Sequence, residues 1–112
     1  MTASYLYSNL LTVLTKARSV MLSPEWQAEL DASTANVRVS AGRQMIALQG
    51  AVLSLSNASL SDVATAMQAN ETDLTTCTTD LTGALRDITK VQRILDSIAK
   101  ALPVVAKIVP LL

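Results

Sequence analysis

The chain has 112 residues, half of them apolar, and its nine basic residues balance nine acidic ones. This length fits one domain, the apolar content excludes a disordered chain, and the lack of a basic excess argues against nucleic-acid binding. There is no histidine and only one cysteine, so the sequence excludes an intramolecular disulfide and a thiolate metal cluster and shows no catalytic, cofactor or metal site.

The first predicted helix spans about residues 3–21. Its apolar residues recur at helical spacing along one face, and a second apolar stripe beside them widens that face. The first stripe comprises Leu6, Leu10, Val13, Ala17 and Val20. A helix with so broad an apolar face is expected to be buried on two sides.

The second predicted helix spans about residues 24–55. Ser23 and Pro24 are a typical start signal, because a hydroxyl caps the first turn and proline is tolerated at the first helical position. Trp26, the only tryptophan, is expected to anchor a core or an interface. Gly42 and Gly50 lower the helix propensity of this segment but permit the close approach of another helix.

The third predicted helix spans about residues 60–112 and carries a heptad repeat. Two columns with a seven-residue period have apolar side chains at fifteen of sixteen positions. This pattern is typical of a coiled-coil helix whose apolar seam packs on a partner helix. Pro103 and Pro110 lie on the outward side, so we expect helix to at least Ala101. The columns are Leu60, Met67, Leu74, Leu81, Ile88, Leu95, Leu102 and Val109, and Val63, Asn70, Cys77, Ala84, Val91, Ile98, Val105 and Leu112.

Two less apolar residues of the seam allow more than one interpretation. Asn70 is either a device that fixes register, since a buried amide needs a matching partner, or a partly exposed residue near a helix end. Cys77 is expected to be a small buried apolar residue rather than a redox site.

The predicted helices can be arranged in two ways. The clearest chain reversal lies at residues 56–59, and it makes the second and third helices antiparallel. The first helix either folds back beside the second, which gives a three-helix bundle, or continues it, which gives a long antiparallel hairpin. Both are all-α and treat residues 1–112 as a single domain. The antiparallel pairing is supported by charge, because it sets Glu25, Glu29 and Asp31 level with Arg86, Lys90 and Arg93. It also sets Arg38 and Arg43 level with Asp80, Asp73 and Glu71.

The apolar seam is too broad for one neighbouring helix. Leu85, Ile94 and Ile108 flank it near the carboxyl end of the chain, and a stripe of this width needs two neighbours. We therefore expect a homo-oligomer, most simply a dimer that forms a four-helix assembly. The predicted interface comprises Leu81, Ile88, Val91, Leu95, Ile98, Leu102, Val105 and Val109.

These features predict a non-enzymatic helical interaction or scaffolding protein. A cytoplasmic location is expected, because residues 1–15 lack the basic start of a secretory signal and no stretch reaches 18 apolar residues. A second hypothesis is a membrane-active helical hairpin. Residues 97–112 carry Lys100 and Lys107 on one face and apolar residues on the other, as segments that lie on anionic membranes do.

Overall fold

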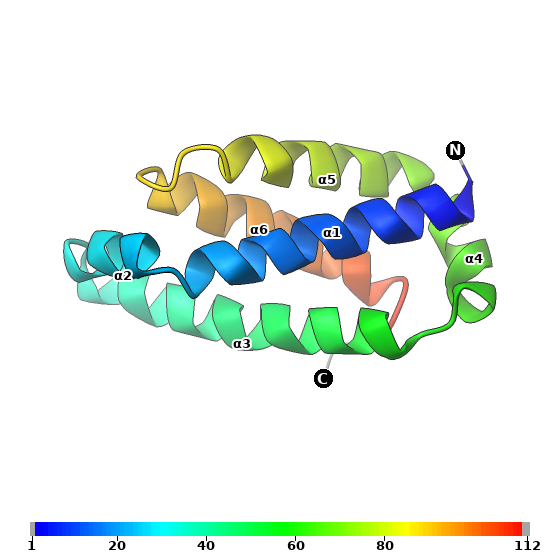
Figure 1. Ribbon diagram of the computed structural model, residues 1–112, viewed down its shortest axis with the longest axis horizontal. Coiled ribbons are helices and arrows are strands. Elements are labelled where there is room, and N and C mark those ends of the chain that lie inside the picture. Colours follow the sequence, from blue (N-terminus) through cyan, green and yellow to red (C-terminus); the bar gives the residue numbers. More distant parts are fainter. Residues whose placement is uncertain (1, 111–112) are drawn as a thin grey trace.

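The computed structural model describes residues 2–110 (Figure 1). In that range the chain forms six α-helices and no β-strand, which confirms the all-α prediction. The helices are α1 (Ala3–Met21), α2 (Pro24–Asp31), α3 (Ala35–Asn57), α4 (Leu60–Ala69), α5 (Glu71–Ala84) and α6 (Val91–Ala106).

The first predicted helix is confirmed as α1, but the second is divided into α2 and α3. Helix α2 begins at Pro24 as predicted, and the Ser23 hydroxyl accepts a hydrogen bond from the Trp26 amide at 3.2 Å. The division follows from two more hydroxyl groups. The Ser33 hydroxyl donates to the Glu29 carbonyl at 2.8 Å, and the Thr34 hydroxyl accepts from the Val37 amide at 3.3 Å and so caps α3.

The prediction of one continuous helix over residues 60–112 is wrong. Helix α4 ends at Ala69, and the side-chain amide of the next residue, Asn70, donates to the Ala66 carbonyl at 2.8 Å. Residues 85–90 form a second break, in which the Asp87 carboxylate accepts from the Thr89 amide at 3.1 Å and from its hydroxyl at 2.5 Å. These local bonds give the backbone an alternative to helix. Helix α6 continues past Ala101 to Ala106, as expected, and residues 111 and 112 lie outside the described range.

Four of the helices form a bundle within one chain. Helix α1 packs along α3 and α5, and α6 packs along the same two helices on the opposite side. Helices α1 and α5 run in one direction and α3 and α6 in the other (Figure 1). The chain therefore adopts neither predicted arrangement. Helix α1 does fold back beside α3, but the carboxyl-terminal region supplies two bundle helices because it reverses at residues 85–90.

The two short helices close the ends of the bundle. Helix α2 contacts α1, α3 and α6, and α4 packs on α1 and joins α3 to the diagonally opposite α5. Trp26 of α2 and Met67 of α4 are fully buried, so each short helix contributes a large side chain to the core. Tyr7 also fixes the α3–α4 turn, because its hydroxyl donates to the Leu55 carbonyl at 2.7 Å. The expected anchoring role of Trp26 is thus confirmed in the core.

The predicted charge matching between the second and third helices is only partly reflected in the fold. Glu29, Lys90 and Arg93 line one hollow at the α2 end, so they lie level as predicted, although these described residues form no ion pair within 4.0 Å. The expected pairing of Arg38 and Arg43 with α5 is wrong, because α3 and α5 are diagonal in the bundle. The acids of α5 instead contact α6: Asp73 forms an ion pair with Lys107 at 3.3 Å, and Asp80 accepts from the Ser97 hydroxyl at 2.7 Å.

We predict that Ile98→Ala lowers the free energy of unfolding by about 2–5 kcal/mol, because Ile98 is fully buried and its truncation leaves a cavity. The loss should not depend on protein concentration, since the residue lies in the core of one chain. Urea unfolding at two concentrations checks both points. Thr79→Ala, on the exposed side of α5, is the control and should change stability by less than about 0.5 kcal/mol. A loss that grows on dilution would contradict the bundle within one chain.

Candidate functional site

The residues of the predicted interface lie inside the bundle. Leu81, Val91, Leu95, Ile98, Val105 and Val109 are buried, and Ile88 and Leu102 are half-buried against the same core. The two neighbours that the broad seam requires are α3 and α5 of the same chain. A second chain could reach these side chains only if the bundle opened, so the closed fold does not offer them as a surface.

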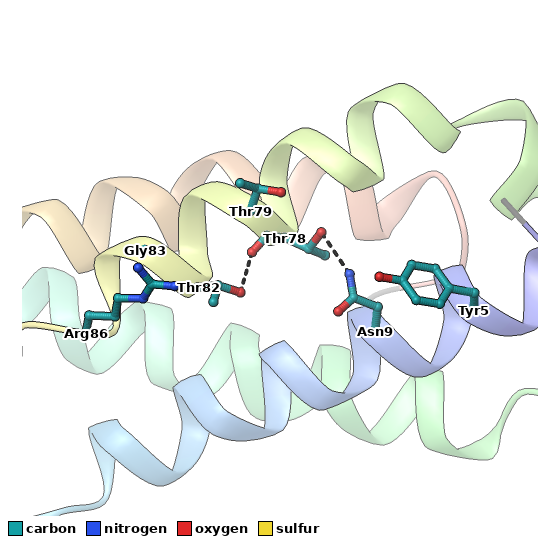
Figure 2. A pocket seen from close by; sticks show the side chains of 7 residues that line it. All are labelled: Tyr5, Asn9, Thr78, Thr79, Thr82, Gly83 and Arg86. Carbon is teal, nitrogen blue, oxygen red and sulfur yellow. Dashed lines mark hydrogen bonds between the residues drawn. The ribbon is translucent and has the colours of Figure 1, made fainter.

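A polar hollow of about 380 Å³ lies between α1 and α5 (Figure 2). Two hydrogen bonds lie within its lining: the Asn9 amide donates to the Thr78 hydroxyl at 3.2 Å, and the Thr82 hydroxyl donates to the Thr78 backbone carbonyl at 2.6 Å. The lining offers hydroxyl, amide and guanidinium groups but no carboxylate or imidazole that could take a proton from a hydroxyl. We interpret the hollow as polar packing of α1 on α5. Its lining residues are Tyr5, Asn9, Thr78, Thr79, Thr82, Gly83 and Arg86.

The only thiol of the chain, that of Cys77, is buried and is a poor nucleophile at neutral pH. The Cys77 thiol donates to the Leu74 carbonyl at 3.5 Å. Burial, reinforced by the negative charge of Asp73, raises the pKa of Cys77 to about 11. Because the thiolate is the nucleophilic form, Cys77 acts as a small apolar residue at neutral pH, as expected from the sequence.

Asn70 lies at a junction between helices rather than inside a helix seam. Its half-buried side chain bonds to the carbonyl of Ala66, one turn earlier in α4. This bond satisfies the amide within the chain, so the amide needs no matching partner on another helix. Of the two interpretations of Asn70, the structure agrees with the second, a partly exposed residue near a helix end.

Helix α3 presents a line of large apolar side chains to solvent. Val39, Ile46 and Leu53 follow one another at seven-residue intervals and are 55%, 72% and 53% exposed. Gly42 and Gly50 lie on the same side of the helix, and a Cβ atom added at Gly42 would meet no atom within 4 Å. We call these five residues, Val39, Gly42, Ile46, Gly50 and Leu53, the outer α3 face.

An apolar groove of about 300 Å³ adjoins one edge of the outer α3 face. Gly42 and Met45 of α3 form one wall, and the other contains Leu22, which is mostly exposed, together with Trp26 and Leu30. Gly42 belongs to both the face and the groove. The two features therefore form one continuous apolar surface, which is the strongest candidate for a functional site.

This surface was not predicted from the sequence. The side of α3 that faces the core carries Leu48, Val52 and Leu55, which are buried. The signal that could have located the outer face is the second seven-residue column through Val39, Ile46 and Leu53. Two apolar columns on one helix indicate two neighbours.

The described residues contain no group of three or more side chains suited to hold a metal ion. Within residues 2–110, no helix is both long and apolar enough to cross a membrane. The chain matches no protein-family model, and neither curated proteins nor solved structures give a significant match. The candidate site thus depends on the geometry described above.

We predict that Cys77 reacts slowly with a disulfide reagent such as dithiobis(nitrobenzoic acid). Its pKa of about 11, against an ordinary 9.0, lowers the thiolate fraction at pH 8 by about a hundredfold. The rate should rise steeply between pH 8 and 10, and unfolding in urea should remove the protection. A native rate at pH 8 equal to that of the unfolded chain would contradict the burial of Cys77.

Proposed function

We propose that the protein is a non-enzymatic helical interaction protein that self-associates as a folded bundle. The observation that carries this proposal is the outer α3 face, where Val39, Ile46 and Leu53 expose their side chains in one line about 21 Å long. Single exposed apolar residues are common, whereas a continuous apolar surface marks an interaction site. Each of these side chains would gain up to about 1.5–3 kcal/mol from full burial.

The charge of the protein is compatible with self-association. Nine basic and nine acidic residues give no net charge, so there is no net electrostatic repulsion between two copies of the chain. The same balance disfavours a nucleic-acid partner. We place the contact on the outer α3 face and not on the seam of α6, because the seam residues are engaged in the core. A cytoplasmic location, inferred from the sequence, completes the proposal.

A membrane-active protein is the second candidate function. It is supported by α6 and the residue that caps its end: Lys100 and Lys107 lie on one side, and Ile98 and Val105 lie on the other. In the closed bundle the apolar side packs on α3 and α5, and Lys107 forms an ion pair with Asp73. Membrane contact would therefore require α6 to separate from the bundle at residues 85–90.

We predict that Ile46→Lys abolishes self-association and leaves the fold intact. Ile46 is mostly exposed, so lysine costs little in the monomer but places a charge in the middle of the proposed contact. Sedimentation at concentrations from micromolar to millimolar should show a mass that rises for the wild-type protein and remains that of a monomer for the variant.

The matched control is Tyr5→Lys, which also replaces a large exposed side chain but lies on α1, away from the outer α3 face. It should associate like the wild-type protein. A wild-type protein that stays monomeric throughout would overturn the proposal. Anionic phosphatidylserine vesicles added to the same samples should bind no protein, and binding accompanied by exposure of α6 would favour the second candidate.

A further inference from the structure

We infer that the outer α3 face binds a second copy of this chain in antiparallel orientation, with a two-fold axis through Ile46. The inference rests on the proposed self-association and specifies its geometry. In such a contact α3 of one copy lies along α3 of the other with the direction reversed. Each residue then comes level with the residue at the same distance on the other side of Ile46 in the partner.

The spacing of residues on the outer α3 face is symmetric about Ile46. Val39, Gly42, Ile46, Gly50 and Leu53 are separated by three, four, four and three positions. Reversal of the helix therefore sets aliphatic residues level with aliphatic residues and glycine level with glycine: Val39 with the partner's Leu53, Gly42 with the partner's Gly50, and Ile46 with the partner's Ile46. An isologous contact requires this self-complementarity.

No close contact among the described residues requires a glycine at position 42. Glycine in a helix interior lowers stability by about 1 kcal/mol relative to alanine, and here no neighbouring atom fills the space of the missing side chain. A second helix in close contact would use that space. Gly42 leaves such a recess beside Ile46, into which the partner's isoleucine can pack as a knob into a hole.

Charge selects the antiparallel over the parallel orientation. The charged residues of α3 are Arg38 and Arg43, both in its first half, and its last turn holds no basic side chain. A parallel pair would set Arg43 beside the partner's Arg43. The antiparallel pair sets it level with the partner's Gln49 and sets Arg38 level with Ser54 in the last turn, where the helix dipole favours a positive charge.

The apolar groove beside Gly42 fits the same geometry. It lies along the edge of α3 that carries Arg38, Gly42 and Met45. Seen along the helix axis, Leu53 lies on that same side of Ile46, as helical spacing of 100° per residue requires. The two-fold rotation therefore brings the partner's Leu53 over the groove, against Leu22 and Met45, and extends the contact beyond a single pair of helices.

Cysteine cross-linking in a Cys77→Ala background tests the orientation. Ile46→Cys should form a disulfide dimer at a rate at least about tenfold above that of Tyr5→Cys, the collisional control, because cysteines on the axis are adjacent. Val39→Cys and Leu53→Cys should each fail alone and should cross-link when mixed. Efficient dimerisation of Val39→Cys alone would show parallel pairing and overturn the inference while leaving self-association intact.

A second variant separates the contact from the fold. Gly42→Gln should melt at no lower temperature than the wild-type protein when both are monomeric, because glutamine is the better helix former and has room. It should nevertheless weaken association by at least about tenfold, because its side chain fills the recess. Unchanged association of this variant would overturn the inference. Monomeric wild-type protein with no cross-linking above the control would overturn the proposed function as well.

Discussion

The arrangement of the whole chain depends on the burial of the apolar side of α6. That side is too broad for one neighbour, and α3 and α5 cover it from two directions. To bring α5 beside α6, the chain must reverse at residues 85–90. Because α3 must also lie beside α6, the chain has to connect α3 to α5 across the diagonal of the bundle. Helix α4 makes this connection. Helix α1 packs on α3 and α5 on the side opposite α6 and completes the four-helix bundle.

The same constraint explains why α3 keeps an exposed line of large apolar side chains. Helix α3 contributes Leu48, Val52 and Leu55 to the core, yet its sequence carries a second apolar column on the opposite side. Because α1 and α6 pack on the core side of α3, no other helix of residues 2–110 covers that column. The polar hollow between α1 and α5 differs, since the Asn9 side chain of α1 donates a hydrogen bond to the Thr78 hydroxyl of α5.

The sequence was sufficient to predict the all-α class, the span of α1 and much of the core. Leu74, Leu81, Leu95 and Ile98 are buried as the heptad columns predict. The columns could not reveal the breaks, because a seven-residue repeat records which positions are apolar and not whether the backbone between them stays helical. Local side-chain hydrogen bonds of Asn70 and Asp87 favour the breaks instead. The outer α3 face was missed because periodicity alone does not say which of two stripes meets the core.

Helix α6 is covered by helices of its own chain. The most direct test is isotope-filtered nuclear magnetic resonance on a mixture of labelled and unlabelled protein. In a uniformly labelled sample, we predict nuclear Overhauser effects between methyl groups of α3 and Ile98 or Val105 of α6. In the mixed sample, filtered to retain only contacts between chains, these signals should be absent. Their persistence would show that α6 packs on a second chain and would contradict the account.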